Sequence, residues 1–330
     1  MSLALPTCAR AVSALGLALA CTAAAAQSSS SVQLYGLIDM SVGSFENSGA
    51  DRLARADSGK FTTSFFAFKG TEDLGGGLKA MFNLEAFLAA DSGASIGRTF
   101  WDRQSNVGLG GSFGNVFLGH NTTSMFVQGL MFNPFSSSMG FSPTMRFLYS
   151  THAPYAVSDG GTAWTNSIFY GTPTFGGFSG TLQASLKEAA GGKNSYAASA
   201  LYSGGALAAG VVFENEQIGA SDQKTWLLSG SYDLQVAKLF GQYGQTKDDA
   251  GDEKYKMFQL GASAPLGGGS LLASYGQQKR EEADVKVKTF SFGYDYFLSK
   301  RTDLYAVYMY DKVTDLDSGN TFAVGIRHRF

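Results

Sequence analysis

The feature that most constrains this chain is an alternation of apolar and polar residues with a period of two. Between residues 31 and 45, Leu34, Ile38 and Val42 share one parity, while Asp39 and Ser41 share the other. Successive side chains of a β-strand point to opposite faces, so the pattern predicts a strand with one apolar and one polar face. The alternation recurs along the chain after residue 31, without a sustained 3.6-residue period. We therefore predict a single all-β domain.

Segment length and the spacing of turns narrow the all-β class. Strands of about ten residues, tilted by about 45°, span the ~25 Å apolar band of an outer membrane. Short turns alternate with longer polar connections, as in outer-membrane barrels. The seven predicted turns are 73–77, 110–114, 172–177, 203–205, 233–236, 265–269 and 298–301, and the eight predicted loops are 47–59, 89–98, 121–161, 188–194, 216–223, 248–254, 280–286 and 313–320. These connections predict a transmembrane antiparallel β-barrel of sixteen strands.

An aromatic stripe near the C-terminus indicates which solvent covers the outer face. Phe290 and Phe292 share one parity, and Thr289 and Ser291 share the other. No predicted helix is available to cover the stripe, and no mature segment is apolar enough for a membrane helix, so lipid is the expected cover. The last strand ends on Phe330, and its closure onto the first strand would remove both sheet edges.

The N-terminus has the features of an export signal. An Ala-rich apolar run ends in small residues, which predicts a signal peptide over residues 1–26, cleavage between Ala26 and Gln27, and a mature barrel domain over 27–330. Cys21 also permits a lipoprotein, but Ala18 stands where that motif has leucine. Both cysteines leave with the signal, which excludes disulfides and cysteine metal sites. The mature chain keeps 24 basic against 27 acidic residues, which gives no support for nucleic-acid binding.

The connection over residues 121–161 is long, aromatic and free of acidic residues. The acid-free interval covers 56 residues, from Arg103 to Ser158. Irregular backbone is tolerated at membrane depth where it is buried in protein or lines a water-filled cavity. We therefore predict that this loop folds inward and narrows the barrel.

Several stretches carry a family resemblance, and they keep their order along the mature chain. The chain resembles the Gram-negative general porins, in particular the trimeric kind from beta-proteobacteria. The matching stretches are 32–39 (VQLYGLID), 68–80 (FKGTEDLGGGLKA), 103–109 (RQSNVGL), 175–180 (FGGFSG), 298–305 (LSKRTDLY) and 325–330 (GIRHRF). The resemblance implies a sixteen-stranded barrel, a homotrimer, passive diffusion of small hydrophilic solutes and ions, and a third loop that forms the constriction. It also implies that Phe330 is part of the signal read by the barrel-assembly machinery.

The constriction residues depart from the family pattern. Phe65, His120 and Phe169 stand where the family usually has arginine, and the acids usual on the loop are missing. Basic rings in a pore favour anions. With no acid on the loop, we predict a weak anion preference. A pore without ion preference stays open as an alternative, because Asp39 and Glu85 share the lumen face and could pair with the cations. The predicted constriction residues are Lys69, Lys79, Arg103, His120 and Arg146, with Asp39 and Glu85 as the acids.

The aromatic residues of the loop allow two interpretations. They could form a contact surface for an apolar or sugar-like solute, or they could pack the loop against the barrel wall, which is the commoner fate of aromatics. The residues concerned are Phe126, Phe132, Phe135, Phe141 and Phe147.

Taken as a sequence, the chain is expected to be an outer-membrane general diffusion porin in contact with outer-membrane lipid. The three histidines show no ligand spacing and no nucleophile motif is present, so we expect neither an enzyme nor a cofactor or metal site. Two alternatives stay open: a substrate-selective porin that uses the loop aromatics, and a surface adhesin or receptor barrel.

Overall fold

The computed structural model describes residues 30–149, 161–187, 192–219 and 221–330. The predicted signal peptide and the last part of the predicted inward loop, residues 150–160, lie outside the described residues. In the described part of the chain, sixteen antiparallel strands form a closed barrel. They are β1 (Ser31–Phe45), β3 (Phe65–Gly75), β4 (Leu78–Ala89), β6 (Gln104–Gly111), β7 (Gly114–Thr122), β8 (Ala163–Gly171), β9 (Phe178–Ser185), β10 (Ser195–Gly204), β11 (Leu207–Ile218), β12 (Ser221–Asp233), β13 (Lys238–Asp248), β14 (Glu253–Leu266), β15 (Gly269–Arg280), β16 (Val285–Phe297), β17 (Thr302–Val313) and β18 (Gly319–Arg329).

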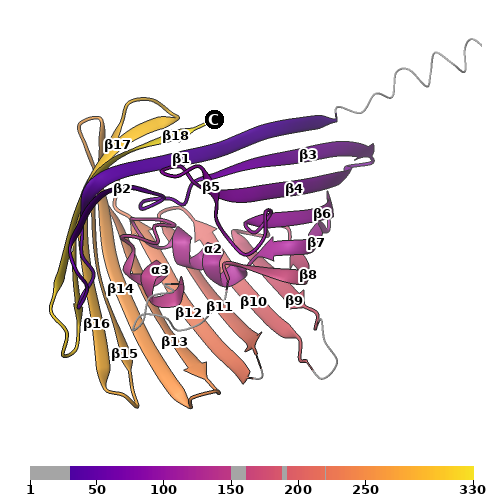
Figure 1. Cartoon of the computed structure of the whole chain (residues 1–330). Helices are drawn as coiled ribbons and strands as arrows, with labels where there is room; N and C mark the ends of the chain where they lie inside the picture. The colour runs from indigo at the N-terminus through magenta and orange to yellow at the C-terminus, as the bar shows by residue number, and fades with distance from the viewer. Residues whose placement is uncertain (1–29, 150–160, 188–191, 220) are drawn as a thin grey trace, which may run out of the picture.

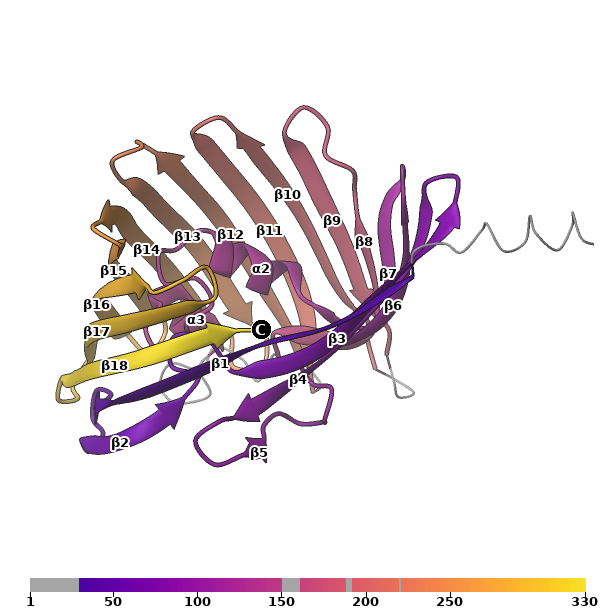
Figure 2. The ribbon, with the colours of Figure 1, turned by 90° about the horizontal axis from the view of Figure 1, so that it is seen from above.

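Strand β1 closes the barrel. Its first half pairs with β3 and its second half with β18, so that the N-terminal and C-terminal strands lie side by side (Figure 2). The N–H of Phe330 donates to the carbonyl of Gly36, and the N–H of Gly36 donates to the carbonyl of Phe330, both at 3.1 Å. A Cβ on Gly36 would lie 2.6 Å from the Phe330 ring and 2.6 Å from the Phe65 carbonyl, so this close approach requires glycine.

The predicted alternation of faces is confirmed. Ile38 and Val42 are 40% and 56% exposed on the outer surface, whereas the intervening Asp39 and Ser41 are buried. Phe290 is likewise exposed, next to a fully buried Thr289. The outer face is therefore apolar and the inner face polar, as contact with lipid requires. Among the described residues, none of the helices has the length and apolar character needed to cross a membrane.

Three predicted loops contain more regular structure than expected. The first long connection, residues 46–64, includes β2 (Leu53–Ser58), which pairs with β1. The second long connection, residues 90–103, includes β5 (Ala94–Ser95), which pairs with β4. The predicted loop 216–223 is instead mostly strand, because β11 runs to Ile218 and β12 begins at Ser221. Polar residues marked this segment as a loop, but a strand that continues beyond the apolar band carries polar residues on both faces.

The long connection between β7 and β8 folds into the barrel, as predicted (Figures 1 and 2). It contains α2 (Ser124–Met131) and α3 (Pro143–Tyr149), where the sequence indicated only irregular backbone. Helices of eight and seven residues are too short to show a periodic pattern. The hydroxyl of Thr123 caps α2 by accepting a hydrogen bond of 3.2 Å from the Phe126 N–H. We call the described part of this connection, residues 123–149, the inward loop.

Candidate pore constriction

The inward loop lies against one side of the barrel interior. Helix α2 packs on β10, β11 and β12, and α3 packs on β14, β15 and β16 (Figure 1). The loop therefore thickens this wall and leaves the lumen bounded by β1, β3, β4 and β6 on the other side (Figure 2). Its course narrows the barrel near mid-height, which is the arrangement of a pore constriction.

Most aromatic side chains of the inward loop serve packing. Phe132, Phe135, Phe141 and Phe147 are each at most 1% exposed. Phe135 and Phe141 lie 5.9 and 6.2 Å from the ring of Phe61, which belongs to the first long connection. These four side chains do not lie on the pore surface. Phe126 differs, because it is only partly buried and stacks edge-on against Tyr149 at 5.5 Å.

Polar side chains of the inner barrel face hold the inward loop through its backbone. The hydroxyl of Ser291 donates to the Phe141 carbonyl at 2.6 Å, and Gln259 accepts from the Thr144 N–H at 2.8 Å. The amide of Gln242 on β13 donates to the carbonyl of Gly129 in α2 at 3.0 Å. Buried amides and hydroxyls on the strands thus satisfy loop groups that lie away from water.

Asp39 is buried rather than exposed to the lumen. Its carboxylate accepts hydrogen bonds from the N–H groups of Phe61 and Thr62, both at 2.7 Å, and from the hydroxyl of Tyr305 at 2.6 Å. The side chain holds the first long connection against the inner wall. The prediction that Asp39 is a lumen acid is therefore corrected: three donors occupy its oxygens and little of it is available to a passing ion.

Glu85 and Arg103 form an ion pair on the lumen face. The Arg103 guanidinium bonds the Glu85 carboxylate, and Tyr35 donates its hydroxyl to the same carboxylate. The Arg103 guanidinium also lies 4.2 Å from the centre of the Phe65 ring. Phe65, at a position where the family resemblance predicted arginine, thus supports a neighbouring arginine. The charges of this pair largely cancel.

Lys69 and Lys79 lie on the lumen face of β3 and β4. The Lys69 ammonium lies 4.8 Å from the centre of the Tyr35 ring, and both lysines are exposed. Neither forms an ion pair with any described residue. In the strand register Lys79 stands opposite Asp73 on β3 and Gly110 on β6, next to the short turns. It therefore lies at the periplasmic mouth, whereas Lys69 lies deeper in the barrel, next to the Glu85–Arg103 pair.

Arg146 is a buried cation of helix α3. Its guanidinium lies 3.4 Å from the carboxylate of Asp311 on β17 and donates to Asn47 at 3.2 Å. Asp311 is fully buried and also accepts from the Thr289 hydroxyl at 3.1 Å. Arg146 was predicted as an unopposed charge, and this is corrected: the acid missing from the loop is supplied by the barrel wall.

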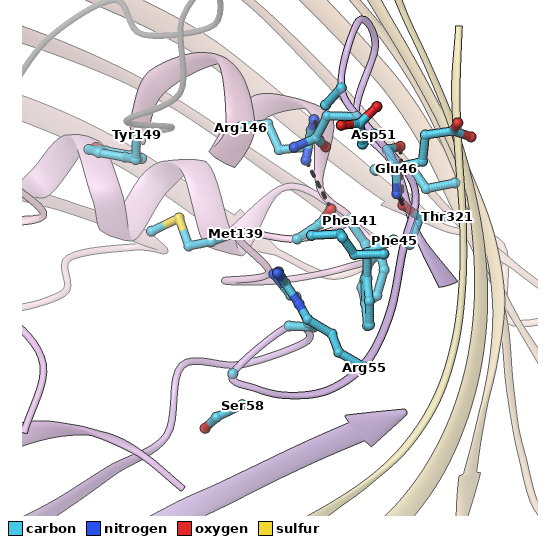
Figure 3. Close-up of a pocket in the computed structure, with 17 residues that line it drawn as sticks. Phe45, Glu46, Asp51, Arg55, Ser58, Met139, Phe141, Arg146, Tyr149 and Thr321 are labelled. Atoms are coloured by element: carbon cyan, nitrogen blue, oxygen red, sulfur yellow. Dashed lines mark hydrogen bonds between the residues drawn. The ribbon is translucent and has the colours of Figure 1, made fainter. Parts of the chain in front are cut away.

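Arg146 also borders a cavity between the first long connection and the inward loop. The cavity has a volume of about 400 Å³. Figure 3 shows Arg146 and Arg55 reaching it from different segments, with Glu46 and Asp51 on its rim. Side chains of both charges therefore border this cavity, alongside apolar side chains such as Phe45 and Met139.

A family model described as Gram-negative porin matches residues 11–316. The chain belongs to this family. Outer membrane porin protein 32 of Delftia acidovorans is 35% identical over 76% of this chain and 74% of its own length. An outer membrane porin of Bordetella pertussis is 29% identical over 94% of this chain and 97% of its own length. This porin is accordingly an outer-membrane protein.

Solved structures agree with this porin in fold. The anion-selective porin from Comamonas acidovorans has a TM-score of 0.79 and 31% identity, and covers 91% of this chain and 100% of its own length. OmpT of Vibrio cholerae, solved in a trimer form, has a TM-score of 0.70 and 18% identity over 91% of this chain and 99% of its own, which speaks for the fold alone.

His120 lies on the outer face of this porin rather than in its lumen. His120 has the parity of Leu118, which is 52% exposed on the outer surface, whereas its neighbour Asn121 is buried on the inner face. Its Nε2 lies 2.8 Å from the carbonyl of Asp102 in the second long connection. The prediction of a constriction histidine, which came from the family resemblance, is corrected for this reason.

Three cations near the constriction were not predicted from the sequence. Arg55 and Lys60, of the first long connection, share Asp57 at 2.7 and 3.0 Å. Arg327 of β18 lies between Asp295 and Asp303 at 2.5 and 2.6 Å. A basic stretch at residues 52–60 was the available signal for the first two. The pairing of Arg327 comes from strand register and had no local signal.

Proposed function

We propose that this porin is a passive channel, and not an enzyme, that passes ions and small hydrophilic solutes with a weak preference for anions. The observation that carries the proposal is the state of the acids around the constriction. Asp39 is occupied by three donors, Glu85 by Arg103 and Tyr35, and Asp311 by Arg146. The inward loop has no acid of its own, and Lys69 has no carboxylate partner among the described residues.

Charge balance then favours anions only modestly. An unpaired ammonium beside the conduction path raises the local concentration of chloride, while each paired cation contributes little. The relative named as anion-selective supports the same sign.

The test is the reversal potential of the purified porin in a planar bilayer under a KCl gradient. The wild type is expected to favour chloride, and Lys69→Gln to reduce that preference. Lys288→Gln, which removes an outward-facing lysine of β16, is the matched control and should leave the potential unchanged. A potential that favours potassium in the wild type would overturn the proposed sign, and the absence of conductance steps would overturn the channel itself.

Neither alternative function gains support from an observation on the molecule. Four of the five loop aromatics are buried, which removes most of the proposed solute contact surface. The adhesin alternative needs long outer loops, and several described connections at that end have about four residues, such as 249–252 and 281–284. Saturable flux of one solute would reopen the substrate-selective alternative.

We further propose that residues 1–26 are removed on export, that the mature porin is a homotrimer, and that Phe330 is recognised during barrel assembly. The trimer follows the family resemblance, and the place of Phe330 at the closing seam supports its role in assembly. Mass spectrometry of the mature protein under denaturing and native conditions tests the cleavage site and the trimer. Deletion of Phe330 should lower the amount of folded porin in the outer membrane.

A further inference from the structure

A row of lysines crosses the outer face of six consecutive strands, β12 to β17. Strand register places lysine directly opposite lysine in every neighbouring pair of these strands. The pairs are Lys224–Lys247, Lys247–Lys254, Lys256–Lys279, Lys279–Lys286 and Lys288–Lys312. We call this row the lysine ladder. Like charges directly opposite each other destabilise a sheet, so a ladder of five such pairs indicates that a counter-ion is part of the arrangement.

The ladder points away from the lumen. On β16, Lys286 and Lys288 are exposed while Val287 between them is fully buried, and β12 shows the same contrast between Lys224 and Thr225. The ladder also lies at the end of the barrel that carries the long connections, next to the loops 249–252, 281–284 and 314–318. In outer-membrane barrels this is the extracellular end.

An aromatic row fixes the depth of the ladder. On four of the six strands an outward aromatic side chain stands two residues toward the membrane from a ladder lysine: Trp226, Phe258, Phe290 and Tyr310. On the other two strands, Tyr243 and Tyr275 stand four residues from a ladder lysine. The ring centre of Tyr243 lies 5.6 Å from that of Trp226, and the ring centre of Tyr275 lies 6.0 Å from that of Phe258. Aromatic girdles mark the membrane interface, and two strand residues span about 7 Å. The ammonium groups therefore lie at the level of the outer-leaflet headgroups.

Part of the ladder is neutralised within the chain. Lys224 and Lys247 share Asp249, at 2.9 and 3.6 Å, and Lys247 also contacts Asp252 at 3.3 Å. Lys256 and Lys279 contact Glu281 and Asp284 at 3.0 and 3.2 Å. These acids leave the lysines of β12 to β15 nearly balanced.

The β16–β17 end of the ladder lacks such compensation. No described carboxylate lies within ion-pair distance of Lys286, Lys288 or Lys312, and Lys312 donates to the carbonyl of Leu316 instead. Lys288 and Lys312 are cross-strand partners, so their Cβ atoms lie about 5 Å apart. One phosphate group could accept hydrogen bonds from both ammonium groups.

We propose that the lysine ladder binds the phosphate groups of an anionic, phosphorylated lipid of the outer leaflet, with the Lys288–Lys312 pair as its strongest point. The lysine stems lie along the apolar wall and their ammonium groups reach the headgroup layer. The aromatic row packs against the upper acyl chains. The bound phosphates supply the negative charge that relieves the repulsion between the paired lysines. This inference does not depend on the selectivity of the pore.

The test is native mass spectrometry of the full mature porin in detergent, titrated with diphosphoryl lipid A. The ladder variant is Lys288→Gln/Lys312→Gln. The control is Lys300→Gln/Arg301→Gln, which removes two exposed charges in the turn at the opposite end of the same strands. At roughly fivefold per lysine–phosphate contact, the ladder variant should bind lipid A at least tenfold more weakly, while the control binds like the wild type.

A second double variant, Lys224→Gln/Lys247→Gln, should lose less affinity, because its lysines already share Asp249. Heat-modifiable migration on gels checks that each variant is folded. The proposal is overturned if the ladder and control variants bind lipid A equally, or if the wild type binds phosphatidylcholine as tightly as lipid A.

Discussion

Replacing Arg146 by glutamine tests whether the barrel wall supplies the acid that the inward loop lacks. The guanidinium is 7% exposed and lies 3.4 Å from Asp311, which is fully buried. Removing one partner of a buried ion pair costs about 3–5 kcal/mol, because the other charge is left uncompensated. Asp311 would keep its hydrogen bonds from Thr289 and from the backbone of Ser48. We therefore expect a loss near the lower limit, about 3 kcal/mol in the free energy of unfolding.

The double variant Arg146→Gln/Asp311→Asn provides the control. With both charges removed, no buried charge is left uncompensated, and the expected cost falls to about 1 kcal/mol. Urea unfolding in detergent micelles, followed by tryptophan fluorescence, measures the free energy of unfolding of the wild type, both single variants and the double variant. The double variant should be about 2 kcal/mol more stable than Arg146→Gln alone.

The same pair has a consequence for conduction. Arg146→Gln leaves Asp311 as a negative charge near the cavity of Figure 3, so the reversal potential should move toward potassium. Asp311→Asn leaves Arg146 as a positive charge and should move it toward chloride. If Arg146→Gln costs less than about 0.5 kcal/mol and neither variant moves the potential, the pair does not hold the loop and the reasoning fails.

Three further variants test other parts of the constriction. Glu85→Gln releases Arg103 from its carboxylate and should increase the chloride preference in the bilayer assay; an unchanged potential would mean that Arg103 is remote from the ion path. Phe141→Ala removes a buried ring that contacts Phe61 and should lower the free energy of unfolding by about 3–5 kcal/mol. As the loop loosens, the single-channel conductance should become larger or noisier. Phe126→Ala, the control, should cost much less. Gly36→Val places a side chain against Phe330 and the Phe65 carbonyl, and should reduce the yield of folded barrel; normal assembly would show that the seam tolerates a shift.

The barrel itself could be predicted because its signals are local. The parity of Ile38 and Asp39 and the short glycine turns each follow from a few neighbouring residues and from the uniform demand of lipid on the outer face. The inward loop was also recognisable, since a long stretch without acids is unusual in a chain with 27 acidic residues. Its helices were not, because α2 and α3 are too short for periodicity and depend on contacts with the wall.

The charges of the constriction could not be assigned in the same way, because their partners are remote in sequence. Arg146 meets Asp311, and Asp39 meets Tyr305 across the closing seam of the barrel. Strand parity correctly placed Asp39 on the inner face, but it did not show which donors would occupy the carboxylate. His120 was wrong for a different reason: the prediction came from the family resemblance, whereas strand parity from the outward Leu118 places His120 on the outer face.

These pairings lead to a general argument about selectivity in this porin. A count of cations and acids on the inner face would suggest strong local fields, yet most of these charges are matched within a few ångströms and act at a distance mainly as dipoles. The preference for an ion then depends on which charges lack a partner, and on the described lumen face of β3 and β4 these are Lys69, deeper in the barrel, and Lys79, at the periplasmic mouth. It follows that Glu85→Gln, Asp311→Asn and the loss of Lys69 should change selectivity far more than their single charges change the total of the chain. If selectivity instead followed net charge alone, Lys288→Gln on the outer face would shift the reversal potential as much as Lys69→Gln on the inner face, and the argument from pairing would be refuted.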